Sequence, residues 1–584
     1  MRRLIGCLKR GPILRSMSMG VATGGLVLGC AGGGRSAPVT FTISFPAAAH
    51  ADPITGRLFV VIARDSSPEP RLRVGSFTQT TPFFAADVSG LAAGQSATIS
   101  DTTPGYPTAS IRDLPAGDYY VQALMNVYTE FHRADGHTIW AHMDQWEGQH
   151  FNRSPGNLVS EVRRVHLDPQ AGYAVALSLT KVLPPVVVAA DSKYVKRVKI
   201  QSDILTKWWG HPIYFGATVL LPEGYDAHPN VNYPVLYQQG HFGLGAPLGF
   251  DTVQTPISPA AAARNASFNL TPGHELYQAW TKPRFPRMIV ITFQHPTPYF
   301  DDSYAVNSAN NGPFGDAIMQ ELIPYVESHF RIIKQPYARV LSGGSTGGWE
   351  SLALQLYHPD FFGGTWTQFP DPVDFHHYDL VNAYADTNAF YINNTGGEGL
   401  AGFASEWYRP PRYFMRDNDG QPLLNVRMFS QLEDVIGSHG RSAEQLEIWE
   451  AVYGPAGPDG YPVPLWDKRT GVINHDVANY MRDHGYDLSA YVASHWSTIG
   501  PQLVDKIHVD VGDMDNFYLN LGVYDFQAAM EATRNPHVPG VFLYGRPEKG
   551  HGWRHAIAPD LLREMAASIV KHTPSGQRSV GWQY

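Results

Sequence analysis

The chain has 584 residues, of which 43% are hydrophobic and 12% aromatic, so it has enough material for several domains with large buried cores. Its formal net charge of −9 and the lack of a long basic run exclude the electrostatic pattern of a nucleic-acid-binding protein. The two cysteines, Cys7 and Cys30, both lie near the N-terminus, which excludes a disulfide framework or a cysteine-based metal site in the rest of the chain.

Residues 1–36 are typical of an export signal and a linker. A basic region with five Lys or Arg residues in the first fifteen positions precedes a modest apolar stretch over residues 21–28, which ends at Gly29 and Cys30. The run 26–30 resembles a bacterial lipobox, in which Cys30 would be lipidated; an ordinary signal peptide with an incidental cysteine is the alternative. We expect an exported protein, either a periplasmic or membrane-anchored lipoprotein or a secreted protein, whose membrane contact is at most an N-terminal lipid anchor.

Residues 37–188 predict an all-β accessory domain. β-rich runs over residues 40–43, 57–62 and 119–124 are separated by turn signals such as residues 115–118, which favours a β-sandwich. The segment 131–157 contains four histidines and is predicted to be a long exposed loop that faces the next domain. Metal binding is the alternative, but these histidine spacings fit no compact ligand template.

Residues 189–584 alternate between strand and helix patterns, which predicts a doubly wound, mostly parallel α/β sheet. Buried strands are expected at 233–237, 288–293, 339–341, 506–511 and 541–544, with an amphipathic helix over 318–330 that Pro324 should kink and a closing helix over 559–571. Residues from about 371 to 499 are extra to this sheet. They are rich in aromatic residues, Gly and Pro, and we interpret them as an insertion that caps the mouth of the active site.

Ser345 lies in a G-x-S-x-G sequence, residues 343–347, directly between a strand pattern and a helix pattern. This context is typical of a nucleophile elbow, where small neighbours allow a sharp strand-to-helix turn and the hydroxyl is exposed at the edge of the sheet. A structural glycine turn is the alternative.

A serine nucleophile needs a histidine base and an acid that orients the base, and in this kind of sheet the chain order is Ser, acid, His. His551 lies between the last strand and the closing helix, which makes it the candidate base, with His555 as the alternative. Asp515 follows the strand 506–511 and is the candidate acid, with Asp513 as the alternative.

The developing oxyanion needs hydrogen-bond donors. We expect one from the backbone N–H of Thr346, the residue after the nucleophile. The second is expected from the loop that follows the strand 233–237, at the backbone N–H of His241 or, alternatively, of Phe242.

These segments together resemble the putative-esterase branch of the α/β-hydrolases, which includes enterochelin esterases, feruloyl and acetyl-xylan esterases, S-formylglutathione hydrolase and mycolyltransferases. The resemblance covers roughly residues 195–370 and 500–575 and lies in the runs 233–243, 312–316, 343–349, 512–517 and 550–553. It implies an α/β-hydrolase fold in which Ser345, Asp515 and His551 form the triad. Gln239 and Gly240 stand where the branch often has His-Gly.

The sequence therefore predicts an exported serine esterase that acts through an acyl-enzyme, with no metal and no organic cofactor. Aromatic residues of the capping region, Trp366, Trp407, Tyr408 and Trp449, suggest a small-molecule or glycan-linked ester substrate. The alternative is that they pack the insertion's own core, which is the commoner role of any single buried aromatic residue. The alternatives are an acyltransferase with the same triad, a serine peptidase, and a non-catalytic surface lipoprotein that binds glycan or protein.

Overall fold

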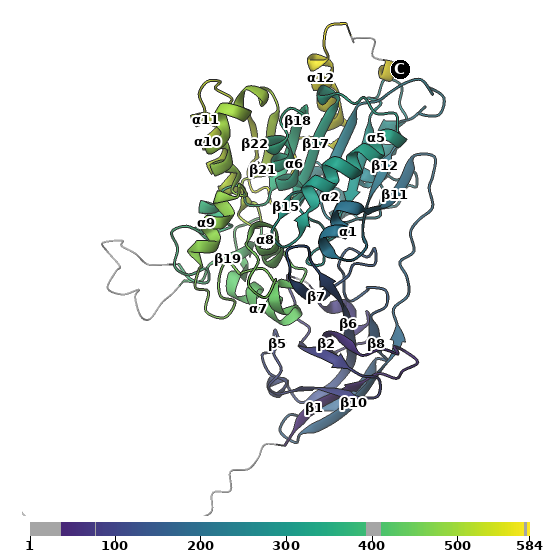
Figure 1. The fold of residues 1–584 in the computed structure, drawn as a ribbon, viewed down its shortest axis with the longest axis vertical. Coiled ribbons are helices and arrows are strands. Elements are labelled where there is room, and N and C mark those ends of the chain that lie inside the picture. The colour runs from purple at the N-terminus through teal and green to yellow at the C-terminus, as the bar shows by residue number, and fades with distance from the viewer. Residues whose placement is uncertain (1–36, 76, 393–409, 577–580) are drawn as a thin grey trace, which may run out of the picture.

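The computed structural model describes residues 37–75, 77–392, 410–576 and 581–584 (Figure 1). The predicted signal region with Cys30 lies outside the described residues, as do Trp407 and Tyr408. None of the described helices is both long enough and apolar enough to cross a membrane.

The N-terminal part is an all-β domain, in agreement with the prediction. Its strands follow one hydrogen-bonded path, β4-β1-β10-β8-β6-β2-β3-β5, rather than two separate sheets, and β7 and β9 also pair with β6. The strands are β1 (Val39–Ser44), β2 (Ile54–Ala63), β3 (Phe83–Leu91), β4 (Ser96–Ser100), β5 (Gly105–Tyr106), β6 (Gly117–His132), β7 (Thr138–His142), β8 (Leu158–Ser160), β9 (Arg163–Leu167) and β10 (Tyr173–Val182).

Strand β2 is buried on both faces, and this explains its continuous hydrophobic run. Leu58, Val60 and Ile62 belong to the domain's own core. Phe59 and Val61 belong to a second core that continues into the α/β region. Because successive side chains of a strand point to opposite faces, the all-β domain packs against the rest of the chain through this strand.

The second part is an eight-stranded sheet in the order β11-β12-β14-β13-β17-β18-β21-β22. The strands from β14 to β22 run parallel to one another, and β12 alone runs in the opposite direction, antiparallel to both β11 and β14, so the sheet is mostly parallel as predicted. Its strands are β11 (Val195–Ser202), β12 (Ile213–Leu220), β13 (Val235–Gln239), β14 (Ile289–Gln294), β17 (Arg339–Ser345), β18 (Gly364–Pro370), β21 (Ile507–Gly512) and β22 (Val541–Gly545).

Helices flank this sheet in three groups, and the helices within a group contact one another. Helices α6, α10 and α11 form one group, α3 and α12 a second, and α1 and α4 a third. The bounds are α1 (Asp203–Trp209), α2 (Pro259–Phe268), α3 (Gly273–Trp280), α4 (Phe314–Ala317), α5 (Ile323–His329), α6 (Thr346–Tyr357), α10 (Leu488–Ile499), α11 (Leu519–Ala532) and α12 (Ala558–His572). The irregularity expected at Pro324 takes the form of a π-helical turn, η4 (Ile318–Leu322), between α4 and α5, because proline offers no N–H to the preceding turn.

The segment between β18 and β21 contains β19 (Tyr413–Arg416), β20 (Pro422–Asn425), α7 (Val426–Ile436), α8 (Gln445–Tyr453) and α9 (His475–Asp483). Part of this segment, including α7 and α8, lies between the all-β domain and the α/β sheet (Figure 1). The Arg57 guanidinium of β2 donates to the Val435 carbonyl oxygen at 2.8 Å and pairs with Asp87 at 2.7 Å. The insertion is thereby tied to the N-terminal domain, whereas its last helix, α10, packs on α6 and α11 and belongs to the α/β core.

Candidate active site

The turn at Ser345 has the geometry of a nucleophile elbow. Ser345 ends β17 with φ 59° and ψ −123°, a backbone region that non-glycine residues rarely occupy, and α6 begins at the next residue. A Cβ on Gly347 would overlap the carbonyl oxygen of Gln239, and a Cβ on Gly343 would overlap that of Gly347. The glycines of the motif are therefore needed for close packing of the β17–α6 turn against the end of β13.

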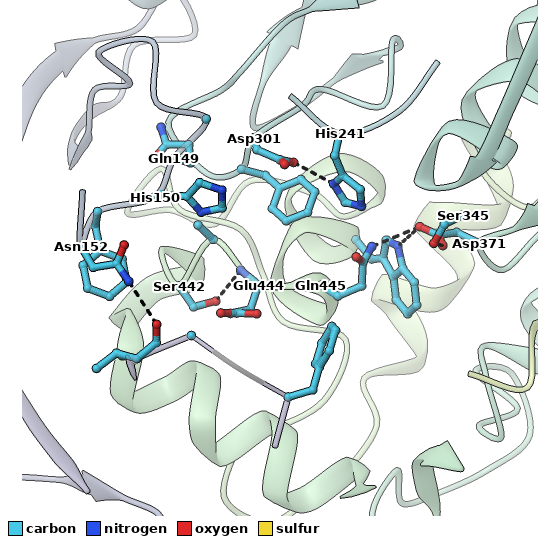
Figure 2. A pocket seen from close by; sticks show the side chains of 18 of the residues that line it. Gln149, His150, Asn152, His241, Asp301, Ser345, Asp371, Ser442, Glu444 and Gln445 are labelled. Carbon is cyan, nitrogen blue, oxygen red and sulfur yellow. Dashed lines mark hydrogen bonds and ion pairs between the residues drawn. The ribbon is translucent and has the colours of Figure 1, made fainter. Parts of the chain in front are cut away.

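Ser345 faces a cavity of about 550 Å³ that three parts of the chain enclose (Figure 2). Loops of the all-β domain, the carboxyl ends of the central strands and the insertion each supply a wall, and such a position at the strand ends is where open α/β sheets bind ligands. Lining residues from these three parts include Phe77, Gln149, His150 and Asn152; His241, Asp301, Ser345, Asp371 and His551; and Phe414, Glu444, Gln445 and Trp449.

His551 and Asp515 form a hydrogen-bonded pair at this cavity. Nδ1 of His551 lies 2.8 Å from Oδ2 of Asp515, which is fully buried, and the other Asp515 oxygen accepts the backbone N–H of Phe517 at 2.9 Å. The imidazole lies between Phe369 and Phe517, with ring centroids 4.7 and 5.0 Å away. A carboxylate on Nδ1 fixes the tautomer in which Nε2 is the base.

The Ser345 hydroxyl is directed to a different group. Its Oγ donates to Oδ1 of Asp371 at 3.2 Å, and among the described residues no hydrogen bond joins Ser345 to His551. The structure therefore brings Ser345, Asp515 and His551 to one cavity, with the serine side chain turned toward Asp371. Sequence reasoning missed Asp371, although its position directly after the strand beside the nucleophile strand is a usable signal.

The alternative acid and base lie elsewhere. Asp513 accepts the backbone N–H of Lys549 at 3.1 Å and does not line the cavity. His555 binds Asp510 through Nδ1 at 2.6 Å and Glu564 through Nε2 at 2.9 Å. Burial opposes protonation of His555, but these two carboxylates outweigh it and raise its pKa to about 9.

Donors for an oxyanion are available near Ser345. Thr346 is the first residue of α6, where backbone N–H groups have no acceptor within the helix. His241 follows β13 in the loop against which Gly347 packs, so its backbone N–H lies in the same region. The backbone N–H of Phe242, the next residue in this loop, stays the alternative donor; the Phe242 side chain packs edge-on against Trp146 of the all-β domain, with ring centroids 5.3 Å apart.

The His241 side chain adds a positive charge that sequence reasoning did not foresee. Nδ1 lies 3.0 Å from Asp301, and 46% of the side-chain surface is accessible at the cavity. Burial lowers the pKa of His241, but the carboxylates of Asp301, Asp302 and Asp371 outweigh it and raise the pKa to about 10. His241 is therefore an imidazolium at neutral pH.

A buried cluster of His295, Asp302 and Glu350 lies behind this loop and has ligand atoms close enough to hold an ion. Nδ1 of His295 accepts the Ser303 backbone N–H at 3.0 Å, so Nε2 carries the ring hydrogen and is not available to a metal. Burial raises the pKa of Asp302 to about 7 and that of Glu350 well above its usual range. The proton on Glu350 and the ring hydrogen on Nε2 of His295 leave this cluster without a set of free ligand atoms, and we assign no metal to it.

The histidines and aromatics that the sequence singled out are divided between several places. Gln149 and His150 line the cavity, so the segment 131–157 does face the next domain, but Trp146, Gln149 and Phe151 are buried rather than exposed. Trp449 lines the cavity, whereas Trp366 stacks on His508, with ring centroids 4.6 Å apart, outside it.

Residues 214–372 match the family model described as Esterase: Putative esterase. Among curated proteins, none matches the chain. Similar solved structures include a ferulic acid esterase (15% identity, 65% of this chain, 98% of that chain, TM-score 0.34). A second is an S-formylglutathione hydrolase from Agrobacterium tumefaciens (11% identity, 66% of this chain, 96% of that chain, TM-score 0.31). A third is FphF, a fluorophosphonate-binding serine hydrolase from Staphylococcus aureus (15% identity, 64% of this chain, 99% of that chain, TM-score 0.29). The resemblance to the putative-esterase family that the sequence predicted is confirmed, and residues 214–372, which include Ser345, carry it.

Proposed function

We propose that this protein is a serine esterase that hydrolyses a carboxylic ester through an acyl-enzyme. The observation that supports it most is the shared cavity: Ser345 on a strained strand-to-helix turn and His551, which Asp515 holds at 2.8 Å from behind, line the same space. The match to the esterase family over the segment that holds the turn supports the same reaction class.

The residues suggest a defined sequence of steps. Ser345 Oγ turns from Asp371 toward Nε2 of His551, gives up its proton and attacks the ester carbonyl carbon. The backbone N–H groups of Thr346 and His241 donate hydrogen bonds to the oxyanion, and the His241 imidazolium lies beside them. His551 then protonates the leaving alcohol, and a water molecule repeats the sequence on the acyl-enzyme and releases the acid.

Labelling with a fluorophosphonate probe tests the nucleophile. We expect one probe per wild-type chain and none on Ser345→Ala, measured by intact mass. Ser342→Ala is the matched control, because the Ser342 hydroxyl donates to the Trp366 carbonyl oxygen inside the sheet. Labelling of Ser345→Ala, or a folded wild type that resists the probe, would contradict the proposal.

A panel of p-nitrophenyl, hydroxycinnamate and acetylated-sugar esters then measures the reaction itself. Release of acid without an acceptor supports hydrolysis. Products that form only when a sugar acceptor is added indicate acyl transfer by the same residues, and cleavage of peptide amides in preference to esters indicates a peptidase.

We also propose that the chain is exported and lipidated at Cys30, on the basis of the basic and apolar pattern of residues 1–30. Cell fractionation of wild type and Cys30→Ala tests this. We expect wild type in the membrane fraction and the variant released from it; equal partitioning of both would contradict lipidation, and retention of both in the cytoplasm would contradict export.

A further inference from the structure

Hydrogen bonds hold the carboxylate of Asp371 mainly through one of its two oxygens, Oδ2. Asp371 is the first residue after β18, and its side chain is almost fully buried beside the nucleophile. Four donors converge on Oδ2: the Tyr304 hydroxyl at 2.5 Å, the Thr346 hydroxyl at 3.1 Å, Gln445 Nε2 at 3.1 Å and Trp449 Nε1 at 3.2 Å. Among the described residues, Oδ1 accepts from the Ser345 hydroxyl alone, at 3.2 Å (Figure 2).

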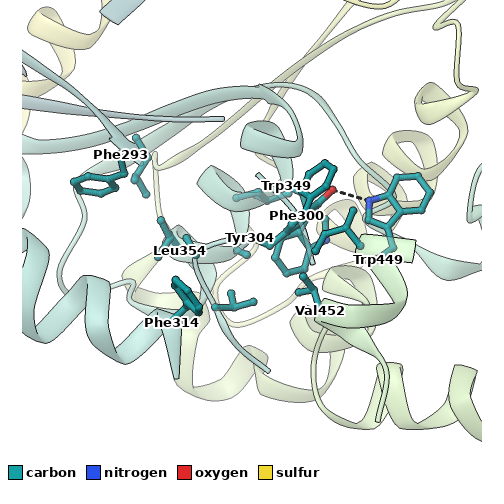
Figure 3. Packing of buried hydrophobic residues seen from close by; sticks show 14 of the residues in the cluster. Phe293, Phe300, Tyr304, Phe314, Trp349, Leu354, Trp449 and Val452 are labelled. Carbon is teal, nitrogen blue, oxygen red and sulfur yellow. Dashed lines mark hydrogen bonds between the residues drawn. The ribbon is translucent and has the colours of Figure 1, made fainter. Parts of the chain in front are cut away.

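The four donors make the orientation of this carboxylate rigid. Tyr304 and Thr346 come from the α/β core, while Gln445 and Trp449 come from α8 of the insertion. Trp449 Nε1 also donates to the Tyr304 hydroxyl at 2.7 Å, and the aromatic packing around this bond joins α8 to the core (Figure 3). Oδ1 is therefore fixed toward Ser345 and the cavity, and it does not rotate away when the serine moves.

Ser345 cannot satisfy Asp371 and His551 at the same time, because a hydroxyl has one hydrogen to donate. Catalysis requires the Ser345 hydroxyl to donate this hydrogen to His551. When the serine turns, Oδ1 loses the only hydrogen bond that a described side chain donates to it, and it faces the cavity beside the place where the oxyanion forms. The charge on Oδ1 is then costly unless another donor replaces the serine hydroxyl.

We propose that Oδ1 of Asp371 is a binding subsite for a hydrogen-bond donor of the substrate, namely a hydroxyl or ammonium group on the carbon next to the ester carbonyl or a hydroxyl on the second carbon of the alcohol. This inference rests on the proposed esterase function and specifies its substrate class. The substrate's donor takes the place of the Ser345 hydroxyl on Oδ1 and releases the serine to His551. No covalent step is added to the reaction.

The geometry sets where the donor must be. A carbonyl carbon poised for attack lies about 3 Å from Oγ, and Oγ lies 3.2 Å from Oδ1. A donor two bonds from the carbonyl carbon on the acyl side, or four bonds from it on the alcohol side, can therefore reach Oδ1. It can come from the acyl side, as in a 2-hydroxy or 2-amino acid ester, or from the alcohol side, as the neighbouring hydroxyl of a polyol or sugar.

Matched ester pairs test the subsite. Ethyl lactate and ethyl alaninate are compared with ethyl propionate for the acyl side, and glycol monoacetate with ethyl acetate for the alcohol side, with acid release followed by pH-stat. We expect wild type to favour one donor-bearing series by about tenfold or more in kcat/KM, the size of one charge-assisted hydrogen bond. The favoured pair shows which side of the ester supplies the donor.

Asp371→Asn is the decisive variant. The four donors on Oδ2 should hold the amide oxygen there, so that Nδ2 replaces Oδ1 and presents a hydrogen instead of accepting one. We expect the preference to fall to within about twofold, while the rate of fluorophosphonate labelling, which needs no substrate donor, stays equal to wild type or rises. Asp379→Asn is the matched control: Asp379 is also buried but does not line the cavity, and the preference should survive its substitution.

Failure of this inference and failure of the esterase proposal give different results. Equal kcat/KM within every pair for wild type, or an unchanged preference in Asp371→Asn, overturns the subsite alone. Slower labelling of a folded Asp371→Asn also overturns it, because that result makes Asp371 a support for the serine instead of a competitor for its hydrogen. The absence of both labelling and hydrolysis in wild type overturns the esterase proposal itself.

Discussion

Two histidines, His551 and His555, lie four residues apart on the last loop of the α/β domain, and each is bonded to an aspartate. They differ in the number of carboxylate partners and in whether the ring reaches the cavity. His551 has one carboxylate partner, Asp515, and its ring lines the cavity that holds Ser345. His555 has two carboxylate partners, which occupy both ring nitrogens and raise its pKa to about 9. A histidine bonded to an aspartate is therefore not by itself a catalytic base: it also needs a free, unprotonated second nitrogen that faces the nucleophile.

The sharpest way to break this comparison is to remove each imidazole in turn. We expect His551→Ala to lower kcat by about 10⁶-fold, as loss of a serine-hydrolase base does, whereas His555→Gln should stay within about threefold of wild type because its ring does not line the cavity. Steady-state ester hydrolysis measures both. A large loss of kcat in His555→Gln, with the fold intact by circular dichroism, would show that His555 contributes to catalysis and would contradict the assignment of His551 as the base.

The aspartate partners of the two histidines, Asp515 and Asp510, sharpen the same comparison. Asp515→Asn should lower kcat by about 10⁴-fold, because an amide no longer fixes the Nδ1–H tautomer of His551. Asp510→Asn should leave kcat within about threefold and instead destabilise the fold by about 1–3 kcal/mol, because a buried partner of His555 is lost. Hydrolysis rates and urea unfolding of the two variants separate these effects, and similar kcat values for the two variants would contradict the assignment.

The surroundings of the two pairs also differ in origin. His551 is walled by Phe517, which in turn packs against Phe77 of the all-β domain and Phe414 of the insertion, with ring centroids 5.6 and 5.5 Å away. The partners of His555 come from the α/β domain alone. The catalytic candidate is therefore the one that all three parts of the chain surround.

Truncating the wall from the distant domain tests that point. We expect Phe77→Ala to raise KM about fivefold to tenfold with a smaller change in kcat, since it removes apolar contact from a cavity wall without touching the reacting atoms. Phe41→Leu is the control, because Phe41 packs in the core of the all-β domain and its substitution should affect stability only. An unchanged KM in Phe77→Ala would mean that Phe77 does not contact the substrate.

The sequence predicted the parts of the site that local rules determine. The elbow at Ser345 needs glycines at fixed offsets between a strand and a helix, and the order Ser, Asp, His follows from the topology of the sheet, so both could be predicted from spacing. The choice of His551 over His555 rested on position only, since the directions of two side chains four residues apart in a loop follow no periodicity.

Residues that act across domains could not be found in this way. Phe77 and Gln149 reach the cavity because β2 packs its second face against the α/β region, a contact that no local pattern encodes. The single hydrogen-bonded path of the β domain depends on long-range pairing that strand propensity does not specify. Asp371 and Gln445 meet at the nucleophile although 74 residues separate them, and only the folded insertion brings them together.

The smallest expected effect comes from the charge state of the second pair. The pKa of His555 is raised above its unfolded value of about 6.5, so the folded chain binds this proton more tightly. The resulting stability is fully present below about pH 6.5 and is lost as the pH rises through about 9. Partial exposure of the ring screens the effect, which leaves about 1–2 kcal/mol.

Urea unfolding at pH 6 and pH 10 measures this contribution. Wild type should lose about 1–2 kcal/mol more of its free energy of unfolding between these pH values than His555→Gln, which has no titrating group at this position. Equal losses in the two proteins would mean that the folded chain binds the His555 proton no more tightly than the unfolded chain does. The Nε2 of His555 would then be a poor partner for Glu564, and the distinction between the two histidines would rest on the geometry of the cavity alone.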